Sequence, residues 1–178
     1  LRGETFVTRK ITRAAAQIAY GMETHFYLGN LDAERDWGHA KDYVRVMWMI
    51  LQHDTPEDWV IATGKKTSVR DFVKRTFLEL GIQLEFKGTG KAEKGIISSV
   101  NQQQYKSVTG LSKILVKEKQ VILQVDPNYY RPTEVDTLVG DASKAKEKLG
   151  WECESTLDDL IKEMVLNDVN LVKQQLIK

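Results

Sequence analysis

The sequence predicts an α/β protein, because helical and extended patterns alternate along the chain. Apolar residues recur on one helical face across residues 6–20, and Gly21 follows as a natural stop. Residues 59–64 are instead a short apolar run before a glycine, which is typical of a buried strand in a parallel sheet. Ser68 with Asp71 then begins a capped helix, so the order of strand, loop and helix resembles one unit of a doubly wound sheet.

The other elements are predicted from similar signals. Residues 26–30 form a short strand that ends in a turn, and the helix after it has apolar residues at helical spacing, namely Val44, Met47, Trp48 and Leu51. Thr156 with Asp159 begins a final amphipathic helix. The remaining elements are extended segments at 84–86, 96–100 and 121–125, a turn at 126–128, and a helix from 141 to 149. We interpret the polar tract 101–119 as a variable excursion with little chemistry.

Composition excludes several classes of function. The 178 residues suffice for one domain with a core, or for part of a larger one. Lys and Arg number 26 against 25 Asp and Glu, so net charge gives no reason to expect nucleic acid as a partner. The single cysteine, Cys153, precludes an internal disulfide and suits a reducing compartment, and no apolar run is long enough to span a bilayer. We therefore expect a cytoplasmic protein without a membrane partner.

Familiar catalytic and metal-binding patterns are missing. The glycine-rich segment 88–95 has Glu93 where a dinucleotide-binding loop needs glycine, and it lacks the Lys-Ser/Thr pair of a Walker loop, so a hairpin turn is the better interpretation. No serine lies in a hydrolase elbow. The histidines have no ligand spacing and there is one cysteine, so no metal site is predicted; the histidines are His25, His39 and His53. These residues predict no catalytic group.

Arg35 is the first candidate binding residue. It lies between the strand predicted at 26–30 and the helix that follows, where its planar fork could face a phosphate. The alternative is an ion pair on a solvated loop with one of three nearby carboxylates, Asp32, Glu34 or Asp36. The sequence around Arg35 leaves both interpretations open.

A second arginine, Arg131, favours the binding interpretation. A nucleoside diphosphate carries two or more negative charges, which two guanidinium groups can hold through bidentate hydrogen bonds. Pro132 biases the Arg131 backbone toward extended geometry, and Glu134 could accept hydrogen bonds from ribose hydroxyls. The alternative is that Arg131 and Glu134 pair with each other at the surface.

These segments resemble the C-terminal half of the GDP-mannose 4,6-dehydratases, which belong to the extended short-chain dehydrogenase/reductase superfamily. The resemblance covers nearly the whole chain and is weakest across 101–119. The matching runs are Arg2-Gly3-Glu4-Thr5-Phe6-Val7-Thr8-Arg9-Lys10-Ile11-Thr12-Arg13-Ala14, Leu28-Gly29-Asn30-Leu31-Asp32, Arg35-Asp36-Trp37-Gly38-His39-Ala40-Lys41-Asp42-Tyr43-Val44, Val60-Ile61-Ala62-Thr63-Gly64, Glu93-Lys94-Gly95, Val125-Asp126-Pro127, Arg131-Pro132-Thr133-Glu134-Val135 and Lys148-Leu149-Gly150-Trp151.

The resemblance implies a fold and a set of roles. Residues 1–178 would be the C-terminal, GDP-sugar-binding portion of a larger Rossmann-like enzyme, mostly its substrate-binding subdomain with a returning Rossmann strand and helices. The substrate-binding residues carried over are Arg35 and Arg131 for the diphosphate, Glu134 for the ribose, and Lys10 with the Val7 and Thr8 backbone for the nucleotide end. Arg2 would contact NADP, in this or a neighbouring subunit of a dimer or tetramer, although Leu1 stands where the family has another arginine.

The family converts GDP-mannose to GDP-4-keto-6-deoxymannose with catalytic NADP, on the route to GDP-fucose and other deoxyhexoses. Its Tyr-x-x-x-Lys set and glycine-rich loop are absent from this sequence, so we expect these residues to bind the GDP-sugar and to be inert alone. The start at Leu1 without methionine suggests a piece of a longer protein, although tag removal or processing would look the same. The alternatives are a stand-alone GDP-sugar-binding module and a sister GDP-sugar reductase or epimerase.

Overall fold

The computed structural model describes residues 3, 5–130 and 137–177. This part of the chain forms six α-helices, six strands and two 3-10 turns. The helices are α1 (Val7–Ala19), α2 (Ala40–Leu51), α3 (Val69–Glu79), α4 (Gln102–Thr109), α5 (Ser143–Leu149) and α6 (Leu157–Ile177). The strands are β1 (Phe26–Leu28), β2 (Glu34–Asp36), β3 (Lys66–Ser68), β4 (Ile82–Lys87), β5 (Lys94–Val100) and β6 (Val121–Val125), and the 3-10 turns are η1 (Gly90–Ala92) and η2 (Pro127–Tyr129).

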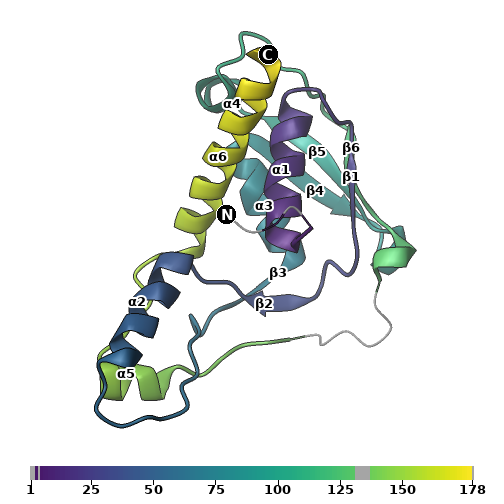
Figure 1. Cartoon of the computed structure of the whole chain (residues 1–178). Coiled ribbons are helices and arrows are strands. Elements are labelled where there is room, and N and C mark those ends of the chain that lie inside the picture. Colours follow the sequence, from purple (N-terminus) through teal and green to yellow (C-terminus); the bar gives the residue numbers. More distant parts are fainter. Residues whose placement is uncertain (1–2, 4, 131–136, 178) are drawn as a thin grey trace.

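The main sheet is mixed and has the strand order β1-β6-β5-β4 (Figure 1). β1 runs parallel to β6, whereas β6, β5 and β4 are antiparallel neighbours. Ile82 and Leu84 of β4 are buried, whereas Gln83 and Glu85, which alternate with them, are exposed, so the sheet has one covered face and one polar face. The turn between β4 and β5 is the glycine-rich hairpin predicted at 88–95. The predicted α/β class is confirmed.

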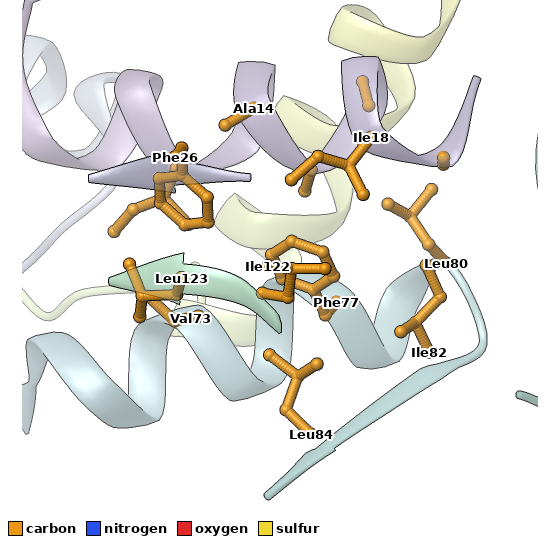
Figure 2. Packing of buried hydrophobic residues seen from close by; sticks show 14 of the residues in the cluster. Ala14, Ile18, Phe26, Val73, Phe77, Leu80, Ile82, Leu84, Ile122 and Leu123 are labelled. Atoms are coloured by element: carbon orange, nitrogen blue, oxygen red, sulfur yellow. The ribbon is translucent and has the colours of Figure 1, made fainter. Parts of the chain in front are cut away.

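Three helices cover the buried face of the sheet. α1 and α3 lie next to the strands, and α6 packs on both of them (Figure 1). Figure 2 shows how Ile18 of α1, Phe26 of β1, Phe77 of α3 and Ile122 of β6 converge in this core. The Phe26 and Phe77 rings stack with their centroids 6.2 Å apart. Fully burying each large apolar side chain contributes about 1.5–3 kcal/mol, which makes this layer the main source of stability.

The predicted helix caps are formed. The Asp71 amide donates to the Ser68 hydroxyl over 3.1 Å at the start of α3. At the start of α6, the Asp159 amide donates to the Thr156 hydroxyl over 3.1 Å, and the Thr156 amide donates to the Asp159 carboxylate over 2.9 Å. Both patterns satisfy backbone donors that the first turn leaves unpaired. Among the described helices, none combines the length and apolar character needed to cross a bilayer.

A second, smaller group of elements lies away from the main sheet. α2 and α5 lie together at the lower end of Figure 1, around a small core of Val46, Ala145 and Trp151. The helix predicted after Arg35 is confirmed as α2, but the apolar stripe that predicted it faces outward. Its members are exposed by 60–80%: Val44 64%, Met47 60%, Trp48 64% and Leu51 80%.

One prediction of local structure is wrong, and one helix was not predicted. Residues 59–64 contain no strand in the described structure, and Val60 is 56% exposed. An apolar run becomes a strand only beside a neighbour that accepts its hydrogen bonds, and no described strand lies there. The tract 101–119 is partly helical, because α4 occupies it and buries Tyr105 completely. The residues of α4 are mostly polar, so they lack the apolar period from which a helix is predicted, and its buried residues are Tyr105 and Thr109.

Candidate functional site

Arg35 lies in the middle of β2, in a small two-stranded sheet. Its antiparallel partner is Thr67 of β3, and its guanidinium donates to the Glu34 carbonyl over 2.7 Å. The residue is half-buried. The structure therefore holds Arg35 in a strand between β1 and α2, whereas the sequence suggested a loop at that position. A strand restricts where the side chain can point more strongly than a loop does.

The carboxylate of Asp36, next to Arg35, is engaged by the segment after residue 62. It accepts hydrogen bonds from the Thr63 amide over 3.0 Å, from the Thr63 hydroxyl over 2.6 Å and from the Gly64 amide over 2.9 Å. These bonds fix the end of the coil that leads into β3. Asp36 is therefore a structural anchor for the small sheet.

Glu34, on the other side of Arg35, also has partners of its own. Its carboxylate pairs with Lys66 over 2.6 Å and accepts from the Thr137 hydroxyl over 2.9 Å. The hydrogen bonds from Lys66 and Thr137 lower the pKa of Glu34. Thr137 also forms a parallel bridge to Glu34, and the Leu138 amide donates to the Glu34 carbonyl over 3.2 Å. The chain thus returns beside β2 directly after residues 131–136.

Asp32, the third carboxylate near Arg35, belongs to a network centred on Arg70. The Arg70 guanidinium donates to Asp32 over 2.6 Å and to both oxygens of Glu93 over 2.7 Å each. Glu93 is only 4% exposed, and its hydrogen bonds are the main reason that the pKa of Arg70 is raised. The network joins the loop after β1, the first turn of α3 and the turn after η1. Asp32, Glu34 and Asp36 therefore each bind a partner in the small sheet or in the Arg70 network.

The other described candidate residues lie at the beginning of α1. Val7 and Thr8 lie in its first turn, where Thr8 is buried. The Lys10 ammonium lies over the ring of Tyr129, 3.9 Å from the ring centroid. Tyr129 is the last residue of η2, so this contact joins the beginning of α1 to the turn after β6. Sequence analysis did not select Tyr129; its position two residues before Arg131 was the available signal.

Arg131, Glu134 and Arg2 lie outside the described residues. Their predicted roles therefore stay predictions. The residues that flank 131–136 are described: Tyr130 follows η2 beside Lys91, whose ammonium is 5.7 Å from the Tyr130 ring centroid. On the other flank, Thr137 bonds Glu34, as described above. Of the described flanks, the one before residue 131 thus lies beside Lys10 and the one after residue 136 lies beside β2.

His39, which lies near Arg35 in the sequence, has a structural role. His39 caps α2: its Nδ1 accepts from the Lys41 amide over 3.1 Å, and its Nε2 lies 3.2 Å from the Glu163 carboxylate. This supports the structural role expected for a histidine near Arg35.

A hollow of about 580 Å³ between β3 and the start of α6 has Trp37, Lys65 and Thr156 among its lining residues. Neither Arg35 nor Lys10 lines this hollow, so we do not assign the binding site to it.

The described residues do not form a dinucleotide cradle. A cradle of this kind needs a strand, a glycine-rich turn and a helix whose N-terminus faces the pyrophosphate. β1 and β6 are the parallel pair in the described part of the chain; β1 leads into β2 and β6 leads into η2. The described residues therefore do not fit an NADP pyrophosphate.

Solved structures define the class of fold. RMD from Pseudomonas aeruginosa, in complex with NADPH, is similar with a TM-score of 0.65 and 13% identity, over 96% of this chain and 44% of that one. A putative epimerase from Burkholderia cenocepacia has a TM-score of 0.64 and 16% identity, over 95% of this chain and 43% of that one. The fold is that of part of an extended short-chain dehydrogenase/reductase.

Sequence comparison identifies the family within this class. The family described as GDP-mannose 4,6 dehydratase matches residues 1–164. GDP-mannose 4,6-dehydratase from Yersinia enterocolitica is 54% identical over 97% of this chain and 44% of its own length, and the human GDP-mannose 4,6 dehydratase is 47% identical over 97% of this chain and 41% of its own length. The chain belongs to the GDP-mannose 4,6-dehydratase family. It spans less than half the length of these relatives, and the match disfavours a sister reductase or epimerase.

Proposed function

We propose that this chain is the GDP-sugar-binding portion of a GDP-mannose 4,6-dehydratase and that it is inert without the remaining portion. The observation that carries the proposal is the arrangement around Arg35. Arg35 lies in β2, and the described residues on the two sides of 131–136 lie beside Lys10 and beside β2. Family membership supports GDP-mannose as the substrate.

Binding of a nucleoside diphosphate is chemically consistent with this arrangement. Two guanidinium groups can each bind phosphate oxygens through paired hydrogen bonds, which makes Arg35 and Arg131 suitable for the diphosphate. Glu134 could accept from the ribose hydroxyls. Lys10 and the backbone of Val7 and Thr8 would contact the nucleotide end. Each charge-assisted hydrogen bond contributes about 1.5–3 kcal/mol, so loss of one arginine should be readily measured.

The chemistry itself needs groups from outside this chain. Conversion of GDP-mannose to GDP-4-keto-6-deoxymannose requires a bound nicotinamide and a general base. The Tyr-x-x-x-Lys pattern of the family does not occur at any of the six tyrosines of the chain. We therefore propose that the chain binds and orients the GDP-sugar, and that NADP and the catalytic residues belong to a dinucleotide-binding portion.

The outward apolar face of α2 supports such a second portion. Val44, Met47, Trp48 and Leu51 form one exposed stripe, and residues 59–64 have a strand-like composition although no described strand pairs with them. Exposed apolar patches of this kind mark surfaces that associate with other protein. We propose that the dinucleotide-binding portion covers the stripe and gives residues 59–64 their missing neighbour.

Two further proposals concern the whole protein. We propose a homodimer or homotetramer in which Arg2 lies near a subunit interface. We also propose a cytoplasmic location, because the single thiol is suited to a reducing compartment. Burial and the neighbouring Asp42 raise the pKa of Cys153 to about 11, so the thiol stays protonated and unreactive near neutral pH.

Titration calorimetry of the chain with GDP tests the binding proposal. Arg35→Met should weaken binding by about 10- to 150-fold, the loss expected for one charge-assisted contact. Arg75→Met is the matched control, because Arg75 is an exposed arginine that pairs with Asp158 and lies outside the site. A folded chain that does not bind GDP would refute the proposal. Equal losses in the two variants would assign the effect to net charge.

A second assay tests inertness. The chain with GDP-mannose and NADP should release no 4-keto sugar, and co-expression with the N-terminal portion of a relative should restore turnover. Turnover by the chain alone would contradict the proposed division of labour.

A further inference from the structure

The contact between Lys10 and Tyr129 joins two segments far apart in the sequence. Lys10 points from the second turn of α1 across the ring of Tyr129, and its ammonium is 3.9 Å from the ring centroid. A cation at this distance from an aromatic face is attracted by the ring quadrupole. Tyr129 is 53% exposed, so its ring is not simply part of the core.

Gly29 makes this arrangement possible. It follows β1, and the backbone of Tyr129 passes directly against it. A Cβ at residue 29 would lie 2.9 Å from the Tyr129 carbonyl carbon and closer still to its oxygen. Backbone atoms cannot move aside as the end of a flexible side chain can, so any larger residue must push η2 away from β1. The Asp126 amide, which donates to the Leu28 carbonyl over 2.9 Å, ties the same two segments together.

We infer that Tyr129 is a positioning residue that holds the Lys10 ammonium in place for the nucleotide, and that Gly29 seats Tyr129. This inference rests on the proposed function, in which Lys10 contacts the nucleotide end. A lysine side chain has many rotamers, so a ligand that binds a mobile ammonium must overcome the loss of that conformational entropy. An ammonium already held over a ring has lost much of that freedom before the ligand arrives.

The position of Tyr129 in the chain strengthens the inference. Tyr129 is the last residue of η2, Tyr130 follows it, and Arg131 is the next residue in the sequence. Any shift of η2 therefore moves the attachment point of the segment that contains Arg131. Lys91 lies 5.7 Å from the Tyr130 ring centroid, so a second cation lies over the same turn. Together these contacts place two lysines and two aromatic rings at one end of the candidate site.

The test is a double-mutant cycle of Lys10 and Tyr129, measured by calorimetry of the full chain with GDP. Tyr129→Leu should weaken binding by about 2- to 5-fold, the equivalent of one exposed cation–π contact. Tyr129→Phe, which keeps the ring, should restore that loss. Lys10→Met should weaken binding further, and the double variant should bind no more weakly than Lys10→Met alone, because Tyr129 acts through Lys10.

Controls separate this role from general stability. Tyr27→Leu is the matched control for Tyr129→Leu: Tyr27 is 41% exposed, lies on β1 and contacts His25. Gly29→Ala should weaken GDP binding at least as much as Tyr129→Leu. Its control is Gly110→Ala, at a residue with φ +74° at the end of α4, where a side chain strains the backbone without touching the site.

The outcomes distinguish the inference from the proposed function. If the folded wild-type chain does not bind GDP, the proposed function fails. If the wild type binds but the losses in the cycle are simply additive, or Tyr129→Leu binds as the wild type does, Tyr129 does not position Lys10 and the inference is wrong. Gly29→Ala with wild-type affinity would overturn the role of Gly29. In the assembled enzyme, the same variants should raise KM for GDP-mannose and leave kcat unchanged, which a loss of folding alone would not do.

Discussion

The exchange of Asp42 for asparagine should destabilise the chain strongly, although the two side chains have the same shape. Asp42 lies in the first turn of α2, directly after the Arg35 segment, and is 3% exposed. Its carboxylate accepts from the Ser155 amide over 3.0 Å, from the Glu154 amide over 3.3 Å and from the Cys153 thiol over 3.2 Å. It thereby clamps α2 to the segment that leads into α6.

The magnitude follows from these contacts. An asparagine keeps one acceptor oxygen and turns the other into a donor, which then faces a backbone amide. One buried amide loses its partner, at a cost of about 1–3 kcal/mol, and the remaining bonds lose their charge assistance, about 1 kcal/mol more. We expect Asp42→Asn to lower the free energy of unfolding by about 2–4 kcal/mol.

The same group adds a pH dependence. Burial by itself raises the pKa of Asp42, but the hydrogen bonds from Cys153 and Ser155 outweigh it and the pKa is lowered. A lowered folded-state pKa contributes stability above the unfolded value near 4, and this stability is lost as pH falls through the folded value. The wild type should therefore lose more stability in acid than the asparagine variant does.

Urea unfolding followed by tryptophan fluorescence is the suitable assay, because the Trp151 indole donates to the Asp42 carbonyl over 3.1 Å. Asp158→Asn is the control: Asp158 is an exposed acid in the first turn of α6 that pairs with Arg75 over 3.0 Å. That change should cost less than about 1 kcal/mol. A loss below about 1 kcal/mol in Asp42→Asn would refute the reasoning, since it would mean that the clamp amides are satisfied by water instead.

Three further perturbations test other parts of the molecule. Trp48→Glu should leave the free energy of unfolding of the isolated chain within about 0.5 kcal/mol of the wild type but abolish co-purification with a dinucleotide-binding portion; retained co-purification would exclude the α2 stripe as the contact. Glu93→Gln should cost about 2–4 kcal/mol in urea unfolding because it breaks a bidentate pair with Arg70 on the buried side, whereas Asp32→Asn, at the exposed end of the same network, should cost less than about 1 kcal/mol. Burial is the main reason that the pKa of Tyr20 is raised to about 12, so its neutral form is favoured in the folded chain and the associated stability should be complete below pH 10 and lost as pH rises toward 12. Alkaline unfolding of Tyr20→Phe should lack this component, and the difference in phenolate absorbance between the wild type and Tyr20→Phe should develop only as pH approaches 12.

Local signals in the sequence predicted the helices and strands that make the core. α1, α3 and α6 have an apolar face, and α3 and α6 also have capping residues, so the sequence gives both their type and their limits. α4 was missed because its buried side is mainly Tyr105, although Asn101 caps it and Gly110 ends it. A cap signal without an apolar period is too weak to define a helix, because the same residues also favour turns.

The strand predicted at residues 59–64 was wrong for a different reason. Their composition is correct for a strand, but a strand in a sheet is a relation between two segments, and the described chain offers no second segment there. The outward stripe of α2 has the same origin, because an apolar face predicts a contact without naming the partner. Both features are the ones on which the proposal of a second portion depends.

The sequence by itself determined the class of fold, the family and the capped helices, because each depends on residues close together in the chain or on long matching runs. Only the tertiary structure decided which charges are paired. Asp32 meets Arg70 across 38 residues, Asp36 meets Thr63 across 27, and Asp42 meets Ser155 across 113. Lys10 and Tyr129 are likewise far apart in the sequence, and the fold brings them into contact. Hydrogen bonds and ion pairs form over about 3 Å in space at any separation along the chain, so the fold selects the partners among many that the sequence permits.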